Sequence, residues 1–279
     1  GNNALWSDID MADHFLQKAK EYIKRNKNNP FFLFYTLQQP HVPRTPHPRF
    51  EGLSGMGPRG DVIIEADWAI GELYKTLESE NLLDNTLIIF SSDNGPVLND
   101  GYYDDAVEKL GDHTPKGGLR GGKYSLFEAG TRVPFISYWK GKINPGISDE
   151  MISQIDILNS ISKLVGLEYR SKDGIDFLDL IINNKGKGRE ELILEASTRT
   201  AYRKGDWVMI PPYKGQSIAK NVNIELGNSM DFKLYNLKDD PSQKNDLSNI
   251  EDKKLKEMIK GFVKIRGKEF TNIKNLVLE

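Results

Sequence analysis

The sequence contains no cysteine among its 279 residues. Disulfide bridges, thiolate metal sites and cysteine nucleophiles are therefore excluded within this chain. A basic excess is also absent. The 38 Lys and Arg residues stand against 40 Asp and Glu residues, and the resulting net charge of -2 argues against a nucleic-acid partner. No apolar run is long enough to span a bilayer, so we expect no membrane span.

An initiator methionine and a signal-peptide pattern are missing as well. The chain begins with Gly1, and its first residues do not combine a basic stretch with an apolar one. We therefore expect this sequence to be part of a longer protein.

Apolar patterns in the first 185 residues predict alternating helices and strands. Helical spacing occurs at residues 8–24, 61–80 and 152–161, where apolar side chains recur on one face. Continuous apolar runs typical of buried strands occur at residues 31–37, 86–90 and 133–139. This alternation predicts an α/β fold, in which a sandwich of helices surrounds a mainly parallel sheet.

The pattern changes after residue 185. Three strand-like segments without helices between them lie at 192–196, 202–210 and 232–237, and a helix is expected around 255–262. They predict a small C-terminal antiparallel sheet with one helix packed on it. We expect two domains, 1–185 and 186–279, joined by the Gly- and Lys-rich stretch 185–188.

Polar residues follow two of the predicted strands. His41 comes after the first strand, and Asp93 and Asn94 come directly after the second. Ligands of open α/β sheets bind outside the carboxyl ends of the strands. Carboxylate and amide oxygens are hard ligands that suit Ca²⁺ or Mg²⁺. The alternative is an ordinary turn, since Asp-Asn-Gly is common turn chemistry.

Lys123 lies in a glycine-rich loop, directly after Gly121 and Gly122. Glycines allow a ligand to approach the backbone closely, and a lysine there can neutralise a sulfate or phosphate. The alternative is a solvated surface lysine. His113 lies in the preceding loop, where a histidine can act as acid, base or donor, or can simply be solvated.

Six segments, taken in order, resemble the sulfatase family of the alkaline phosphatase superfamily, the arylsulfatase-type enzymes that depend on formylglycine. They are FFLFYTLQQPHVP (31–43), GDVIIEADWAIGELYKTLE (60–78), NTLIIFSSDNGP (85–96), LRGGKYSLFEAGTRVPFISYW (119–139), AYRKGDWVMI (201–210) and FKLYNLKDDPSQKNDLS (232–248). The first four match the catalytic domain, and the last two match the family's small C-terminal domain.

The resemblance implies a role for each matching residue. Asp93 and Asn94 correspond to the family's downstream pair of calcium ligands, with Mg²⁺ as the alternative ion. Lys123 corresponds to the lysine that contacts the substrate sulfate, and His41 to the histidine near the leaving-group oxygen. His113 falls where substrate contacts vary among members, and we expect it to contact the sugar or ester.

The chain also departs from the family pattern. Members carry Cys-x-Pro-x-Arg, or a serine variant, whose first residue becomes the formylglycine nucleophile, and neither form occurs here. The upstream Asp-Asp metal ligands and the upstream Lys and His are missing too. We therefore expect the C-terminal part of a sulfatase, with the N-terminal strands missing from its sheet and the formylglycine supplied by the missing N-terminal part. The chain alone is expected to be inactive.

Two other functions stay open from the sequence. A phosphodiesterase or phosphonate hydrolase of the same superfamily would carry similar metal and anion ligands, and a non-catalytic binding fragment would keep only half a site. The resemblance further implies a sulfated glycan as substrate and a periplasmic or secreted location. Association with the missing N-terminal segment, or a homodimer, would cover the exposed sheet edge that such a fragment leaves.

Overall fold

The computed structural model describes residue 5 and residues 7–267. They form two compact units. The first comprises Gly1–Leu87, Leu98–His113 and Trp139–Gly141, and the second comprises Ile88–Val97, Thr114–Tyr138 and Lys142–Glu279. The boundary expected after residue 185 falls inside the second unit and remains a prediction. Within the described residues no helix is long and apolar enough to cross a membrane.

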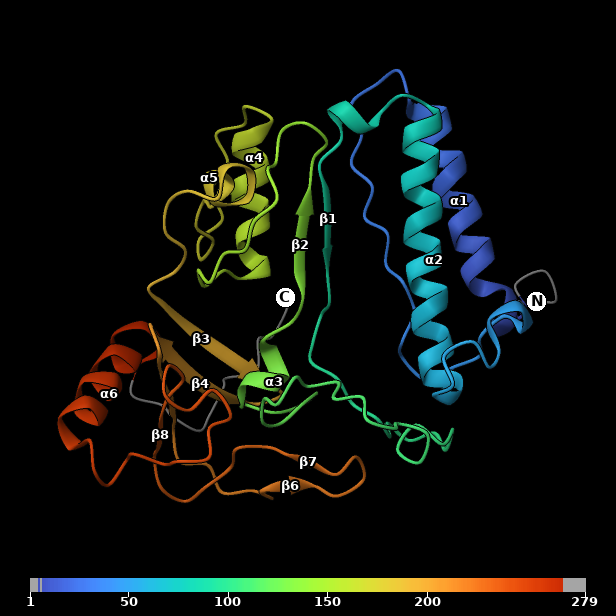
Figure 1. Ribbon diagram of the computed structural model, residues 1–279. Helices are drawn as coiled ribbons and strands as arrows, with labels where there is room; N and C mark the ends of the chain where they lie inside the picture. The colour runs from blue at the N-terminus through green and yellow to red at the C-terminus, as the bar shows by residue number, and fades with distance from the viewer. Residues whose placement is uncertain (1–4, 6, 268–279) are drawn as a thin grey trace. The chain divides into compact units, whose positions relative to one another are not determined.

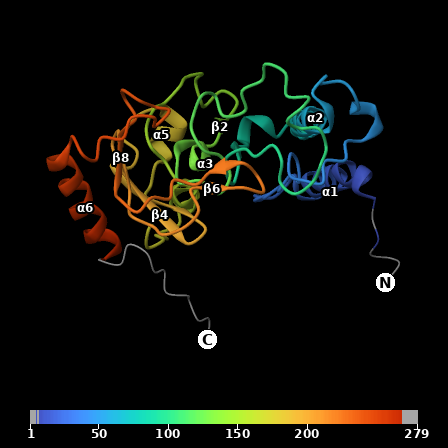
Figure 2. The ribbon, with the colours of Figure 1, turned by 90° about the horizontal axis from the view of Figure 1, so that it is seen from below.

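Two long helices form the centre of the first unit (Figure 1). Helix α1 (Met11–Asn26) lies beside α2 (Gly57–Ser79) in both ribbon views (Figures 1 and 2). Short 3-10 turns accompany them: η2 (Asp8–Asp10), η3 (Pro48–Phe50) and η4 (Leu83–Asn85). The buried residues of α1 are Ala12, Leu16, Ala19 and Ile23, whose spacing places them on one face. Both helices confirm the predicted elements.

The segment 31–37 is extended, but it pairs with none of the strands in the described part of the chain. Its side chains alternate in exposure, and Phe32 and Phe34 are 70% and 79% exposed. The expectation of a fully buried strand is therefore wrong in this structure, because a strand is buried only where neighbouring strands and helices cover it.

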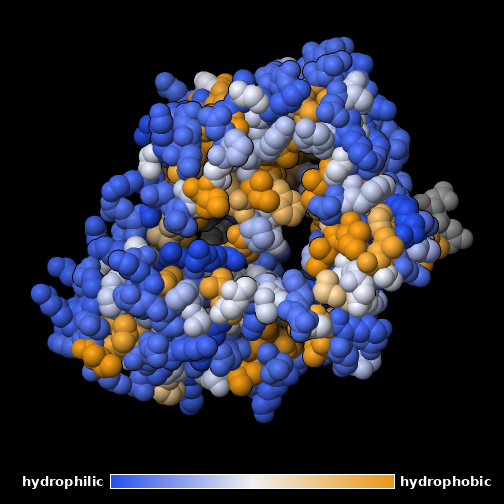
Figure 3. All heavy atoms as spheres, in the orientation of Figure 1, coloured by the Kyte–Doolittle hydropathy of each residue, from blue (hydrophilic) through white to orange (hydrophobic). Residues whose placement is uncertain are grey.

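The face of the molecule drawn in Figure 3 is mostly hydrophilic, and several hydrophobic patches interrupt it.

The second unit begins with a two-stranded sheet. Strand β1 (Ile88–Ser91) pairs antiparallel with β2 (Phe135–Tyr138), with Ser91 opposite Phe135. The α/β class is confirmed, but this described pair is not parallel as expected. The reason is the connection. Residues 92–134, a long loop with one short helix near its end, return to the end of β1 where the loop started, whereas a parallel pair needs a crossover to the opposite end.

Short helical elements accompany β1 and β2 in the second unit, one between the two strands and three after β2. They are α3 (Glu128–Thr131), η5 (Gln154–Asp156), α4 (Ile157–Leu164) and α5 (Leu178–Asn183). A buried ion pair supports this region: Arg189 binds both carboxylate oxygens of the fully buried Asp156. Asp156 also accepts backbone N–H bonds from Ser153 and Ile175.

The C-terminal part forms an antiparallel sheet in the order β3-β4-β5-β8, which confirms the predicted small sheet. Its strands are β3 (Glu191–Ala196), β4 (Arg199–Lys204), β5 (Trp207–Ile210) and β8 (Lys233–Asn236). A separate ribbon consists of β6 (Ile218–Ala219) and β7 (Ile224–Glu225). Helix α6 (Asp252–Arg266) packs against β4 and β5 and lies to one side of these strands in Figure 2.

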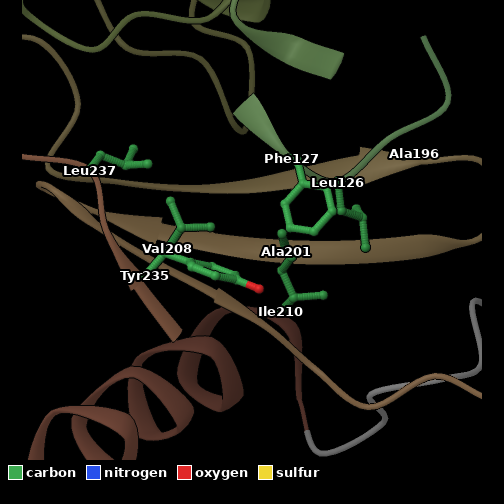
Figure 4. Close-up of a cluster of buried hydrophobic side chains, with 8 residues drawn as sticks. All are labelled: Leu126, Phe127, Ala196, Ala201, Val208, Ile210, Tyr235 and Leu237. Atoms are coloured by element: carbon green, nitrogen blue, oxygen red, sulfur yellow. The ribbon is translucent and has the colours of Figure 1, made fainter. Parts of the chain in front are cut away.

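Alternation along the strands gives this sheet two apolar faces. One face contains Tyr202, Met209 and Leu234, and it packs on Met258 and Phe262 of α6. The other face contains Ala201, Val208, Ile210 and Tyr235, and it is covered by Leu126 and Phe127 (Figure 4). Because Leu126 and Phe127 follow the Gly-Gly-Lys segment, the sheet anchors the loop that carries Lys123.

Candidate functional site

The loop after β1 presents Asp93 and Asn94. The Asp93 side chain is exposed and Asn94 is half-buried. The Asn94 N–H donates to the Asp93 carboxylate at 2.9 Å, and the Ser92 hydroxyl donates to the Asn94 carbonyl at 3.1 Å. From η5, the Gln154 amide donates to the Ser91 hydroxyl at 3.0 Å and to the Ser92 carbonyl at 2.6 Å. These bonds fix the loop directly beyond the end of β1.

Two glycines allow this loop to lie against the Lys123 loop. The Gly95 N–H donates to the Gly130 carbonyl at 2.9 Å, and a Cβ on Gly95 would lie only 1.6 Å from the Ala129 carbonyl oxygen. The Lys123 N–H donates to the Pro96 carbonyl at 3.0 Å. A Cβ on Gly122 would lie 2.6 Å from the same Pro96 oxygen. The structure therefore brings the Asp93–Asn94 loop and the Lys123 loop together, backbone to backbone.

The Lys123 side chain is half-buried, and its ammonium group lies 5.2 Å from the centre of the Tyr124 ring. The loop that carries it has an unusual backbone, with φ of 88° at Gly121 and 75° at Tyr124. The Arg199 guanidinium holds the Tyr124 carbonyl, and the Ser125 hydroxyl donates to the Glu225 carbonyl at 2.6 Å. These contacts hold the strained turn in place.

Arg120 connects the same loop to the C-terminal part of the chain. Its guanidinium donates to both Glu225 carboxylate oxygens, at 2.6 and 3.2 Å, and to the Gln243 carbonyl at 2.7 Å. It also lies 4.0 Å from the centre of the Phe127 ring. Hydrogen bonding to Arg120 lowers the pKa of the Glu225 carboxyl. Arg120 is thus fully engaged in supporting the loop.

His41 lies in the first unit, in the loop that follows the extended segment. Its side chain is 62% exposed. Its Nδ1 lies 2.7 Å from the Val42 carbonyl, and its Nε2 lies 3.8 Å from the Asp100 carboxylate. Arg44 braces this loop by donating to the Pro40 carbonyl at 2.9 Å and to Asp104 at 2.9 and 3.2 Å. The imidazole is therefore accessible on a loop with a fixed backbone.

His113 also belongs to the first unit, where its side chain is exposed. Asp93, Asn94 and Lys123 all belong to the second unit. The structure thus brings together the loops of the three second-unit residues and describes His41 and His113 separately. Sequence reasoning missed Arg44 and Gln154, which support the loops. Arg44 could have been noticed because it follows His41 by three residues in a Pro-rich loop.

The donors at Asp93 and Asn94 have the right chemistry for a hard cation. A carboxylate and an amide oxygen are typical ligands of Ca²⁺, which takes six to eight oxygens. The Asn94 Nδ2 donates to the Gly95 carbonyl at 3.0 Å, and this bond orients the amide. Among the described residues no group of three or more His, Cys, Asp or Glu is placed to hold a metal. The two residues fit a calcium ion as part of a larger ligand set.

A family profile for sulfatases matches residues 7–167. N-acetylgalactosamine-6-O-sulfatase from Bacteroides thetaiotaomicron is 45% identical over 262 residues, which is 92% of this chain and 51% of that protein. N-acetylgalactosamine-6-sulfatase from Homo sapiens is 32% identical over 181 residues, which is 64% of this chain and 33% of that protein.

The fold agrees with these relatives. A solved structure from work on the metabolism of multiple glycosaminoglycans by Bacteroides thetaiotaomicron superposes with a TM-score of 0.91 and 42% identity. It covers 95% of this chain, which in turn covers 56% of that structure. The chain thus spans about half the length of the bacterial relative and of this solved structure. On the profile match, the identities and the shared fold, the chain belongs to the sulfatase family.

Proposed function

We propose that this chain is the C-terminal part of a sulfatase that hydrolyses sulfate esters of sulfated carbohydrates. The observation that carries the proposal is the hydrogen bond from the Lys123 N–H to the Pro96 carbonyl at 3.0 Å. Through it, the loop with the hard oxygen ligands Asp93 and Asn94 lies against the loop with a half-buried cation. Oxygen ligands for a divalent ion beside a cationic side chain form a site suited to an anionic ester.

Each residue has a distinct part in the proposed reaction. Asp93 and Asn94 would hold Ca²⁺, or Mg²⁺ as the alternative, and the ion would supply positive charge for the sulfate oxygens. The Lys123 ammonium binds the same sulfate group and neutralises charge that develops on it. His41 stands near the leaving-group oxygen, where its imidazole donates a proton. His113, on an exposed loop, contacts the sugar.

The nucleophile lies outside this chain in the proposed enzyme. A formylglycine in the N-terminal part supplies it, together with the remaining metal ligands. The proposal fits the coverage of the relatives, since the chain spans 51% of the Bacteroides thetaiotaomicron sulfatase. The enzyme acts in the periplasm or outside the cell, and this part works only in association with the N-terminal part.

The names of two relatives support the proposed substrate class. Both the bacterial protein at 45% identity and the human protein at 32% identity are named as sulfatases of N-acetylgalactosamine 6-sulfate. We propose that the enzyme removes the 6-sulfate of N-acetylgalactosamine in glycosaminoglycans. The net reaction is hydrolysis: the bond between sulfur and the bridging oxygen breaks, an oxygen that derives from water forms a new bond to sulfur, the bridging oxygen takes a proton and leaves as the sugar hydroxyl, and inorganic sulfate is released.

The test compares this chain with the longer protein that contains it, produced in a host that forms formylglycine. Both are assayed with Ca²⁺ on N-acetylgalactosamine 6-sulfate, on the 4-sulfate isomer and on a phosphate diester. We expect turnover by the longer protein, preference for the 6-sulfate and no turnover by the chain alone. Enzyme-like rates from the chain alone, or a preference for the phosphate diester, would overturn the proposal.

A further inference from the structure

Gln243 is a fully buried residue in the loop between β8 and α6, and it contacts the Lys123 loop twice. Its side-chain Oε1 accepts the Glu128 N–H at 2.7 Å, and its backbone carbonyl accepts from the Arg120 guanidinium at 2.7 Å. Arg120 precedes Lys123 by three residues, and Glu128 follows it by five. One residue from the C-terminal part of the chain therefore holds the loop on both sides of the lysine.

The Lys123 loop is closed at the place where Gln243 binds it. The Ala129 N–H donates to the Arg120 carbonyl at 2.9 Å, so residues 120–129 form a short closed segment. Only two residues separate Arg120 from Lys123. A shift of the closed end would therefore move the lysine, because so short a connection cannot absorb the shift.

The turn that carries Gln243 is itself tied to the C-terminal sheet. Gln243 has a φ of 51°, in the left-handed region that a residue with a side chain adopts only where its surroundings hold it. Its N–H donates to the Asp240 carbonyl at 3.0 Å. The Asp240 carboxylate accepts the Asn245 N–H at 2.7 Å and the Ser242 hydroxyl at 3.0 Å. The Asp240 N–H donates at 2.9 Å to the carbonyl of Asn236, the last residue of β8, so the turn is a fixed support.

The Gln243 amide is held in one orientation at a cost. Its Nε2 is buried and makes no hydrogen bond within the part of the chain that the structure describes. An unpaired buried donor is unfavourable, so such a group requires an explanation. The reverse orientation would turn Nε2 toward the Glu128 N–H, where two donors would face each other. The acceptor that Glu128 needs therefore explains an amide whose other end stays unpaired.

We propose that Gln243 is a positioning residue for Lys123. It holds Arg120 and Glu128 so that the loop between them keeps the conformation in which the lysine binds the sulfate group. The inference rests on the proposed function and assigns the C-terminal part of the chain a role in the reaction. Gln243 acts through Lys123 and contacts no substrate itself.

Two substitutions of Gln243 separate positioning from stability in the full-length protein. Gln243→Met keeps the length of the side chain and removes both the acceptor for Glu128 and the unpaired donor. Gln243→Glu keeps an acceptor for Glu128 but buries a carboxyl group, which is costly. The control is Gln216→Met, the same exchange at an exposed glutamine of the second unit.

We expect the Tm of Gln243→Glu to be lower than the Tm of Gln243→Met, and the order of activities to be reversed. At a temperature where all variants are folded, kcat/KM on a sulfate ester should fall about 10–10²-fold for Gln243→Met, as a small misplacement of a binding group implies. The loss should be less than about threefold for Gln243→Glu and for Gln216→Met. Full activity of Gln243→Met, or an equal loss in Gln243→Glu, would overturn the inference.

A double variant tests whether Gln243 acts through Lys123. In a Lys123→Ala background the lysine is gone, so Gln243→Met should lower kcat/KM by less than about a further twofold. The same fold-loss in both backgrounds would show that Gln243 affects the enzyme by another route, and the inference would fail.

Crystal structures of the full-length wild type, Gln243→Met and Gln243→Glu test the position directly. Relative to β4 and β5, Lys123 should move by on the order of 1 Å or more in Gln243→Met and stay in place in Gln243→Glu. An unmoved Lys123 in Gln243→Met would overturn the inference. If the wild type hydrolyses no sulfate ester, the proposed function fails, while these structures still decide whether Gln243 positions the lysine.

Discussion

The backbone N–H of Lys123 donates a 3.0 Å hydrogen bond to the carbonyl oxygen of Pro96. This bond joins two loops that lie far apart along the chain, one beyond β1 and one before α3. A second bond, from the Gly95 N–H to the Gly130 carbonyl at 2.9 Å, joins the same loops. The position of the Lys123 side chain therefore depends on backbone contacts that only small residues permit.

Gly95→Ala should destabilise the protein by about 1–3 kcal/mol, as overpacking of a tight contact does. The added Cβ would lie 1.6 Å from the Ala129 carbonyl oxygen, so the two loops must separate. Urea unfolding measures the loss. The matched control is Gly71→Ala in α2, where a Cβ meets no atom within 4 Å and should stabilise the helix by about 0.5–1 kcal/mol. Equal stabilities of the two variants would contradict the close approach.

Lys123→Ala should lower kcat/KM of the full-length enzyme on a sulfate ester about 10²–10³-fold, in the range seen when one donor to a developing charge is removed. The folded state should be preserved, because the loop is held by the Gly-rich backbone and by Leu126 and Phe127. Lys18→Ala, at a side chain 60% exposed, serves as the control. A loss of less than about threefold for Lys123→Ala would place the sulfate elsewhere.

Asp156→Ala should cost about 3–5 kcal/mol, because it leaves the Arg189 charge buried without its partner. Asp156 is fully buried and binds Arg189 through both carboxylate oxygens. The control is Asp252→Ala, which breaks the exposed pair with Lys256 and should cost less than about 1 kcal/mol. Chemical denaturation of the purified variants gives both values. A small effect at Asp156 would mean that Arg189 finds other partners.

The contact between Arg120 and Glu225 should make stability depend on pH. Hydrogen bonding to Arg120 lowers the pKa of Glu225 below its ordinary value of 4.5 in the folded protein. The ionised Glu225 carboxylate therefore adds to the free energy of unfolding. This addition is fully present when the pH is above the unfolded-state pKa, and it is lost as the pH falls through the lower, folded-state pKa. Glu225→Gln should reduce the free energy of unfolding at pH values above 4.5, the ordinary pKa of this group. The difference in stability between the variant and the wild type should disappear at lower pH.

Urea unfolding of the wild type and Glu225→Gln across this pH range measures the gap. Arg120→Gln provides the control, because Glu225→Gln in that background should lose its pH-dependent effect. A gap that stays constant with pH would show that the carboxylate charge makes no contribution.

Local patterns predicted the elements whose side chains alternate or repeat within one segment. The buried spacing of Ala12, Leu16 and Ile23 in α1 is visible in the sequence, and so is the two-faced alternation of Val208, Met209 and Ile210 in β5. The apolar run before Asp93 stops at Ser91, and this pattern predicts that Asp93 lies just beyond the end of a strand, as it does in the structure. These features depend only on near neighbours in the chain.

Features that depend on distant partners were not predictable in the same way. The antiparallel pairing of Ser91 with Phe135 depends on the path of a long loop. The segment 31–37 has the composition of a buried strand, yet composition does not say which strand lies beside it. The bond from Arg44 to the Asp104 carboxylate likewise joins residues sixty positions apart.

The anchoring of Leu126 and Phe127 on the C-terminal sheet has a consequence for motion. The Lys123 loop cannot detach without exposing one apolar face of β4, β5 and β8, so the loop and these strands should open and close as one cooperative unit (Figure 4). Amide protons of the strands and of residues 125–130 should then exchange with solvent at a common rate. A substitution under the sheet, far from any ligand, would thus change how often the lysine is in place to meet its substrate.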